Sequence, residues 1–340
     1  MIHFSIKIGR AIMPEQLFFT IEVFLNGLMA GVLYSLVALG FVLIYKASGI
    51  FNYAQGVMAL FAAMTLVGIM EGRVPFAHLI NAILGTKIHH FGWHVNAFLA
   101  LMLTMGVMLL LAWLVQKVIF KHLVNQEGII LFMATIGLAY FLEGVGDLMW
   151  GGDIKTLDVG IPQGLNLWID ETTYNMFEYG LFIDNLDIYA SVVAAILVLV
   201  LVGFSQYTKQ GRAMRAVADD HQAALSVGVS LNFIWIMVWT LAGFVALVAG
   251  IIWGTKSGVQ FSLSLIALKA LPVLMLGGFT SIPGAIVGGL IIGVGEKLFE
   301  FAIGPLIGGA TENWFAYVLA LLFLVFRPQG LFGEKIIERV

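Results

Sequence analysis

Long apolar runs with almost no charge constrain the fold of this sequence more than any other feature. A helix needs about 20 apolar residues to cross a bilayer, and backbone in lipid must satisfy its own hydrogen bonds. These runs are continuous rather than alternating, which excludes an outer-membrane barrel. The predicted fold class is an all-α polytopic membrane protein with about 8–10 transmembrane helices. We place the runs near residues 16–46, 53–70, 94–119, 129–150, 188–206, 231–253, 264–277, 282–302 and 313–326.

The composition agrees with a chain whose surroundings are membrane lipid. Of the 340 residues, 61% are hydrophobic and only 11% are charged, whereas a soluble domain carries about a quarter charged residues. The net charge of −3, without any block of Lys and Arg, argues against a nucleic-acid partner. The chain has no cysteine, so it has neither disulfides nor thiolate metal sites.

The first run raises a problem of length. Residues 16–46 would form a helix of roughly 46 Å, which is too long for one span and too short for two. We therefore predict a break near Asn26-Gly27 or at Gly31, which would bring the N-terminus to the inner side. Residues 1–15 lack the cleavage site of a signal peptide and are predicted to lie along the interface as a short amphipathic segment.

The distribution of charge predicts the orientation. Cytoplasmic loops retain Lys and Arg, and the loop 151–187 carries seven acidic residues against one lysine, so it is predicted to lie outside. The loop 207–230 and the tail 327–340 then lie inside. We find no linker or soluble domain, so residues 1–340 are predicted to form a single membrane domain.

A polar interruption bounded by glycine separates the first two runs, over residues 46–56. Irregular backbone is tolerated at membrane depth only against protein or a water-filled cavity. Asn52, Tyr53 and Gln55 are therefore candidates for lining a translocation pathway. The alternative is an ordinary turn at the cytoplasmic surface. The same spacing of Gly-x-Phe and a later glycine recurs over residues 277–284, either as a trace of duplicated halves or by chance.

The glycine-rich segment 277–295 predicts a tightly packed helix. Gly284 with Gly288, and Gly289 with Gly293, are small-xxx-small pairs that let a neighbouring backbone approach closely. Thr280 or Ser281 is expected to cap this helix. Its N-terminus is also a candidate site for a substrate carboxylate, which adds these two residues to the pathway candidates.

Charged residues inside apolar runs are functional candidates because they are costly in lipid. They are Glu22, Asp147, Lys269 and Glu296. A pair between Lys269 and Glu296 would lower the cost of both, and Asp147 lies one turn from Glu143 near the outer end of its helix. A structural ion pair or an interfacial side chain would give the same pattern.

The inner loop 207–230 contains a second kind of signal. Asp219 or Asp220 can cap a short helix that ends at Gly228, and such a helix could fit a groove on a soluble partner. A loop that merely retains positive charge would explain Arg212 and Arg215 but not the capped helix.

Sequence motifs of catalysis are missing from the chain. It has no G-x-x-x-x-G-K-[ST] loop for nucleotide phosphates, no H-E-x-x-H and no G-x-S-x-G. His89, His90 and His94 lie on one predicted outer loop, which favours a solvated loop over a metal site. We predict neither enzymatic activity nor a bound cofactor.

Four segments resemble the LivH-type permease subunit of high-affinity branched-chain amino acid ABC importers. These are Asn26-Gly27 through Gly56, Gly211-Arg212-Ala213 to Gly228, Leu276-Gly277-Gly278 to Gly289, and the tail Arg327-Pro328-Gln329-Gly330-Leu331-Phe332-Gly333. The resemblance implies ABC-importer permease architecture in a bacterial inner membrane. It also implies four kinds of partner: membrane lipid, a second permease of LivM type, two cytoplasmic ATPases that use the ATP, and a periplasmic substrate-binding protein.

The resemblance further identifies loop 211–228 as the ATPase-coupling element, with Gly211, Arg212, Arg215, Asp219, Asp220 and Gly228. Tyr53 and Gln55 depart from the Phe and His of the family's Asn-Phe-Ala-His-Gly version. Relatives of this architecture also import urea, short amides and other small carboxylates, so these solutes stay open. A carrier driven by an ion gradient, with Glu22, Asp147 or Glu296 titrating, is the rival interpretation.

Overall fold

The computed structural model describes residues 15–87, 90–92, 94–123, 126–219 and 221–333. Within these ranges the regular elements are helices, and three isolated β-bridges pair residues of the loops between them. The predicted interfacial segment 1–15 lies almost entirely outside the described residues, as do Asp220 and the end of the tail. The elements are α1 (Glu15–Ser48), α2 (Gln55–Met70), α3 (Ala77–Leu84), α4 (Ala97–Leu114), η1 (Val115–Ile119), η2 (Phe120–His122), α5 (Gly128–Trp150), α6 (Leu167–Phe177), α7 (Asn185–Tyr207), α8 (Lys209–Asp219), α9 (His221–Ser226), α10 (Leu231–Ser257), η3 (Phe261–Leu265), α11 (Ile266–Gly277), α12 (Ile282–Ile307), η4 (Thr311–Asn313) and α13 (Phe315–Phe326).

The all-α polytopic fold is confirmed. Five helical stretches among the described residues are long and apolar enough to span a membrane: α1, α4 with η1 and η2, α5, α7 and α10. The pair formed by η3–α11 and α12, bent by 114°, can supply a sixth span. Two apolar helices, α2 and α13, are shorter, with 16 and 12 residues. By length and composition, the part of the chain that the structure describes therefore holds five or six candidate spans, besides the two shorter apolar helices.

Helix α1 continues without interruption through the predicted break, so that prediction is wrong. Its 34 residues correspond to roughly 51 Å, and a helix longer than the bilayer is thick can tilt or project from it. Gly27 and Gly31 do not bend the helix but provide close contact with α12. A Cβ atom on Gly31 would lie 2.8 Å from the carbonyl oxygen of Gly289. The excess of glycine here reflects helix packing rather than helix breaking.

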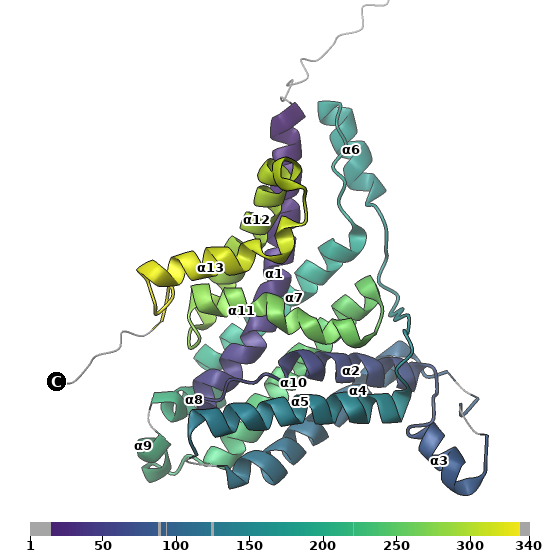
Figure 1. Cartoon of the computed structure of the whole chain (residues 1–340), viewed down its shortest axis with the longest axis vertical. Coiled ribbons are helices and arrows are strands. Elements are labelled where there is room, and N and C mark those ends of the chain that lie inside the picture. Colours follow the sequence, from purple (N-terminus) through teal and green to yellow (C-terminus); the bar gives the residue numbers. More distant parts are fainter. Residues whose placement is uncertain (1–14, 88–89, 93, 124–125, 220, 334–340) are drawn as a thin grey trace, which may run out of the picture.

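The direction of α1 corrects a second expectation. Near its N-terminal end, Phe18 packs against Phe177 and Tyr179 of the acidic loop, with ring centroids 6.1 and 5.6 Å apart. Figure 1 accordingly shows the start of α1 beside α6, far from α8 and α9. Because α1 is one helix, its start and its end lie on opposite sides of the membrane. The start of α1 therefore lies on the predicted outer side, not the inner one.

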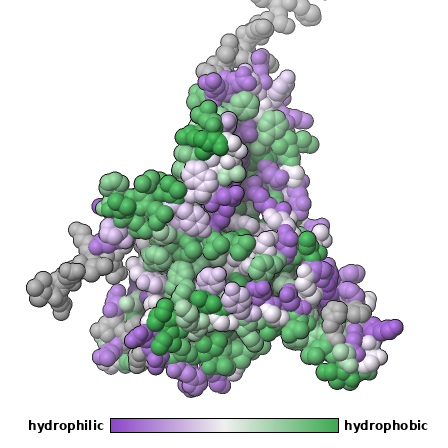
Figure 2. Space-filling model, viewed as in Figure 1, coloured by the Kyte–Doolittle hydropathy of each residue, from purple (hydrophilic) through white to green (hydrophobic). Residues whose placement is uncertain are grey.

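The core forms around two central helices, α1 and α10. Helix α1 packs along α12 and also contacts α7, α10 and α11, whereas α10 packs against α2 and α4. In Figure 1, α2, α4, α5 and α10 run side by side in the lower part of the molecule, and α1 and α12 rise above them. The outward sides of α4, α5, α7 and α13 carry many exposed apolar side chains, which suit contact with lipid (Figure 2).

We expect Gly293→Ala to destabilise the protein, because the added Cβ would collide with the backbone of Gly27 and Gly31. Overpacking of this kind costs about 1–3 kcal/mol. The measurement is thermal unfolding of the purified protein in detergent. Gly203→Ala is the matched control: Gly203 also lies inside a helix, but its Cβ would meet nothing within 4 Å. Equal melting temperatures for the two variants would contradict the packing argument.

Candidate functional site

A short helical segment, η3 with α11, lies between the two spans α10 and α12. Gly258 has a φ of +77°, a conformation that favours glycine, and the next residue forms an isolated bridge with Lys155. Helix α11 has only 12 residues and ends where the chain turns sharply into α12. Cavities lie on both sides of this segment, and Leu265 lines both. A broken helical span beside cavities is the arrangement expected of a membrane pathway.

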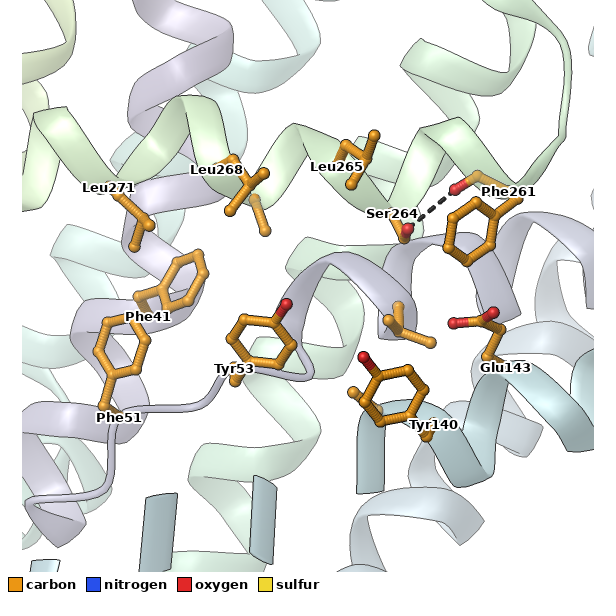
Figure 3. A pocket seen from close by; sticks show the side chains of 13 residues that line it. Phe41, Phe51, Tyr53, Tyr140, Glu143, Phe261, Ser264, Leu265, Leu268 and Leu271 are labelled. Atoms are coloured by element: carbon orange, nitrogen blue, oxygen red, sulfur yellow. Dashed lines mark hydrogen bonds between the residues drawn. The ribbon is translucent and has the colours of Figure 1, made fainter. Parts of the chain in front are cut away.

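The first of these spaces is a groove between α2, α5 and the η3–α11 segment, which we call the aromatic groove. It consists of a cavity of about 90 Å³ and a neighbouring one of about 250 Å³, and Glu143 and Phe261 line both. Figure 3 shows Tyr53 and Tyr140 directed toward the leucines of η3 and α11, and Glu143 beside Phe261. Tyr53 and Asp147, which were predicted as site residues, lie here.

The other two polar residues of the first interruption have a different environment. Asn52 and Gln55 are buried, and the Asn52 side-chain amide donates to Gln55 Oε1 at 3.2 Å. Gln55 in turn donates to the carbonyl oxygen of Ala242 in α10, also at 3.2 Å. These bonds give both buried side-chain amides partners inside the protein. Asn52 and Gln55 line neither cavity, which differs from the prediction that they face a pathway.

The turn from α11 into α12, over residues 277–284, is also held by hydrogen bonds within the protein. Ser281 caps α12, because its Oγ accepts a hydrogen bond from the amide of Gly284 at 3.0 Å. The tail packs on this turn, where the Leu331 amide donates to the carbonyl of Leu276 at 2.8 Å. Thr280 and Ser281 line neither cavity.

Residues 49–56 and 277–284, the two segments with similar spacing of glycine and phenylalanine, contact each other in the fold. The rings of Phe51 and Phe279 lie 6.1 Å apart, edge to face. Phe51 also contacts Phe41 and Phe132, and Tyr45 contacts Phe279. This aromatic cluster lies beyond Tyr53, toward the predicted inner side of the aromatic groove.

The larger space is a cavity of about 810 Å³, which we call the charged cavity. It lies between the outer half of α1, the ends of α7 and α10, the η3–α11 segment and the outer half of α12. Figure 2 shows hydrophilic side chains in this central region, and others at the top, at the right and along the bottom of the view. Its lining is Val23, Asn26, Ala30, Leu33, Tyr34, Phe182, Asp184, Asp187, Trp253, Lys256, Ser257, Ser262, Leu265, Ile266, Lys269, Lys297, Glu300, Phe301 and Glu312.

Two predicted charged residues form an ion pair at this cavity. Lys269 Nζ lies 2.9 Å from Glu296 Oε1, and the hydroxyl of Tyr34 donates to the same oxygen at 3.2 Å. The side chain of Glu296 is 1% exposed, whereas that of Lys269 is 36% exposed. The carboxylate is therefore enclosed by α1, α11 and α12, while the ammonium group faces the cavity.

Sequence reasoning missed the other charges of this cavity. Lys297 Nζ lies 2.7 Å from Glu312 Oε1, and Lys256 Nζ lies 2.5 Å from Asp187 Oδ1. The members of these pairs are separated by 15 and 69 positions along the chain, so only tertiary packing brings them together. Glu22, the fourth predicted charge, lies at the outer end of α1 and is not among the lining residues.

The inner loop contains a helix that was not predicted, α8. Gly211, Met214 and Val217 form its buried side. Gly211 packs closely on the backbone at the end of α7. Arg212 and Arg215 donate to the carbonyl oxygens of Tyr207 and Gln206, each at 3.4 Å.

After α8 ends at Asp219, the short helix α9 follows, and Gly228 then has a φ of +86°. The predicted helix up to Gly228 is thus present, and Asp219 at the end of α8 is exposed. Leu225 and Val227 are exposed apolar residues on the same loop, 52% and 76%. The loop is therefore a folded projection with a mixed polar and apolar surface.

The outer rim of the aromatic groove has its own charge cluster. Lys155, which is 2% exposed, donates to the carbonyl oxygen of Gly151 at 2.6 Å and to Asp153 Oδ1 at 3.2 Å. Arg73 also contacts Asp153, at 3.3 Å. Partial burial alone would raise the pKa of the Asp153 carboxyl. Hydrogen bonds from Arg73 and Lys155, together with their charges, outweigh this effect and lower that pKa.

Because the pKa of Asp153 is lower in the folded state, its carboxylate stabilises the fold above its ordinary pKa of about 4. This stabilisation is lost as the pH falls through the lower folded value. We expect Asp153→Asn to lower stability at pH 7 by less than about 1 kcal/mol, since the side chain is largely exposed. Thermal unfolding at neutral and at acidic pH measures the effect. A difference between variant and wild type that persists below the folded pKa would contradict this account.

We expect a water-filled aromatic groove to admit polar reagents. Because the chain has no native cysteine, Glu143→Cys and Phe141→Cys can each be tested as a single thiol. Glu143 lines the groove, whereas Phe141 is an exposed apolar residue of α5 that does not. A membrane-impermeant maleimide should modify Glu143→Cys several times faster. Equal rates would mean that the groove is not hydrated.

Comparisons with known proteins cover nearly the whole chain. The model of a family described as branched-chain amino acid transport system / permease component matches residues 23–327. The high-affinity branched-chain amino acid transport system permease protein LivH of Salmonella typhimurium is 26% identical, over 96% of this chain and 100% of that protein. BraD of Pseudomonas aeruginosa, described in the same words, is 28% identical over the same shares. The fructose import permease protein FrcC of Rhizobium meliloti is 30% identical over 147 residues, 40% of this chain and 39% of that protein.

Proposed function

We propose a mechanism for this chain from one premise: it belongs to the family of branched-chain amino acid transport system permease components, which matches residues 23–327. The chain is thus a permease of an ABC importer and a multi-pass protein of the inner membrane. In our proposal, it carries branched-chain amino acids inward, because it is similar to LivH and BraD, which are permease proteins of high-affinity branched-chain amino acid transport systems. The single observation that carries the mechanism is the η3–α11 segment, a short helical stretch between the spans α10 and α12 that cavities flank on both sides.

The state described is proposed to be open to the outside. Both cavities lie toward the predicted outer ends of α5, α7 and α10. On the inner side, the aromatic cluster around Phe51 and Phe279 and the buried Asn52–Gln55 bond fill the space. A pathway that opens to each side in turn needs such a closed layer at one end. Inward release would require η3 and α11 to move relative to that cluster.

The energy for this change comes, in our proposal, from partner subunits that use ATP. The chain has no phosphate-binding loop of its own. Helices α8 and α9 are the proposed contact for two cytoplasmic ATPases, because α8 packs on the inner ends of both α1 and α7. Gly211, Arg212, Arg215, Asp219 and Gly228 belong to this contact, with Asp220 at the junction outside the described residues.

The remaining partners act at the outer side and in the membrane. A periplasmic binding protein would deliver the solute to the face formed by the acidic loop 151–187. A second permease of LivM type would cover the aromatic groove, since the exposed Tyr140 hydroxyl and the half-buried Glu143 carboxyl on α5 are unsuited to lipid. The pathway would then have walls from both permeases. No cofactor is required in this mechanism.

The experiment that tests this function is uptake in proteoliposomes. The complete complex should accumulate labelled leucine when the binding protein is present and ATP is supplied on the side of the membrane where the ATPases lie. The purified chain alone should not, with or without an ion gradient. Accumulation by the isolated chain would instead support a secondary carrier that uses Glu22, Asp147 or Glu296. Uptake of urea, short amides or fructose, but not leucine, by the complete complex would change the substrate class.

We expect the double variant Arg215→Ala and Asp219→Ala to assemble normally but to lower ATP-driven uptake by roughly fivefold or more. These residues lie on α8, where the proposed ATPase contact meets α1. Lys121→Ala is the control, because Lys121 is an exposed cation of another predicted inner loop. ATP hydrolysis and uptake are measured on the same preparation. Normal uptake by the double variant would remove α8 from the coupling mechanism.

A further inference from the structure

The charged cavity differs from an ordinary packing defect in its size and its lining. Its volume of about 810 Å³ is in the range of small-molecule sites. Three lysines and four carboxylates line it, in a chain of which only 11% is charged. Charges at membrane depth are costly, and they concentrate at solute pathways. The cavity therefore has the features of a binding site.

The ion pairs of the cavity are open on one side. Here Glu296 is enclosed, while Lys269 is 36% exposed. Among the described residues, the Lys269 ammonium group has two oxygen partners, Glu296 Oε1 at 2.9 Å and the carbonyl of Glu312 at 3.4 Å. A lysine ammonium has three donors, so one donor is left for a ligand in the cavity.

A carboxylate acceptor lies close to this donor. Glu312 contacts Lys269 through its backbone and Lys297 through its side chain, at 2.7 Å. About a third of the Glu312 side chain is exposed. An α-amino acid carries its carboxylate and its ammonium group on the same carbon atom. Neighbouring positive and negative groups are complementary to such a zwitterion.

The remaining walls are apolar and aromatic. Leu33 of α1, Ile266 of α11, Trp253 of α10 and Phe301 of α12 line the same cavity. They can surround an aliphatic side chain, and burial of apolar surface favours its binding. A sugar or a short amide has no charge to match the lysine and carboxylate groups. The lining thus discriminates between the solute classes that the relatives leave open.

We infer that the charged cavity binds the transported solute as a zwitterion with an apolar side chain, with Lys269 receiving the carboxylate and Glu312 receiving the ammonium group. This inference rests on the proposed function and extends it, because it assigns a solute site to this subunit in addition to that of the binding protein. Tyr34 and Glu296 act as positioning residues, since they hold the Lys269 ammonium group at the cavity wall.

The test is equilibrium binding of labelled leucine to the permease–ATPase complex without binding protein. Nanodiscs of phosphatidylglycerol are suitable, because that lipid brings no zwitterionic headgroup to compete. Competitors are leucine, leucinol, which lacks the carboxylate, 4-methylpentanoate, which lacks the ammonium group, and fructose. We expect the last three to compete at least roughly tenfold more weakly than leucine, the loss of one charge-assisted contact.

Variants of the chain then test the assigned residues. Lys269→Gln should weaken leucine binding by roughly tenfold and leave the weak binding of leucinol unchanged. Because Lys269→Gln leaves Glu296 buried without its partner, the paired variant Lys269→Gln with Glu296→Gln is measured as well, and Lys269→Arg should restore part of the affinity. Lys117→Gln is the matched control, since Lys117 lies over Trp113 on the other side of the fold and does not line the cavity.

The outcomes separate this inference from the function on which it rests. Absence of saturable leucine binding, equal competition by leucinol, or wild-type affinity in the paired variant would each overturn the inference. ATP-driven leucine uptake, measured on the same complex with its binding protein, tests the function independently. Uptake without the binding pattern removes only the zwitterion site. The binding pattern without uptake of any solute would contradict the transport role and leave the zwitterion site standing.

Discussion

The close backbone contact between α1 and α12 is the interaction on which the rest of the structure depends. Gly27 and Gly31 of α1 face Gly289 and Gly293 of α12, and Cβ atoms at any of these positions would collide with backbone. In lipid there is little hydrophobic gain from bringing apolar helices together, so close packing and hydrogen bonding must hold them. Ser35 adds a hydrogen bond from its hydroxyl to the carbonyl oxygen of Ile286 at 3.1 Å.

This contact also positions the charges. Tyr34 lies three positions after Gly31, and Glu296 lies three positions after Gly293. Where the glycines bring the helices together, the tyrosine hydroxyl and the carboxylate are within hydrogen-bonding distance. Lys269 reaches the same carboxylate from α11. The pairing lowers the cost of both charges in the membrane, because Glu296 Oε1 accepts hydrogen bonds from Lys269 and Tyr34 and the ammonium group faces a polar cavity.

The sequence predicted those features that depend on composition along one segment. The apolar runs correspond to helices, and the Lys269–Glu296 pair could be proposed because both residues interrupt such runs. Prediction from the sequence was wrong where one residue type can serve two structural purposes. Glycine in α1 was interpreted as a helix break, but it serves a contact with a helix more than 250 positions away, as the Tyr34–Glu296 separation of 262 positions illustrates.

Other features were not predictable for related reasons. Helix α8 is rich in charge, and its apolar side is recognisable only once α1 and α7 are present to cover Met214 and Val217. Asn52 and Gln55 suggested a polar lining, but buried amides satisfied by one another and by Ala242 are equally polar in sequence. The pairs Lys297–Glu312 and Lys256–Asp187 needed the tertiary arrangement to become visible.

Helix α1 connects the two ends of the proposed mechanism. Its inner end contributes Leu43, Lys46 and Ala47 to a small cavity that Met214 and Arg215 of α8 also line. Its middle and outer parts carry Tyr34 and Asn26, which line the charged cavity. A single uninterrupted helix transmits a displacement along its axis with little loss, whereas a break at Gly27 or Gly31 would absorb it. The continuity that contradicted the sequence-based expectation is therefore what allows a movement of α8 on the inner side to alter the walls of a cavity on the outer side.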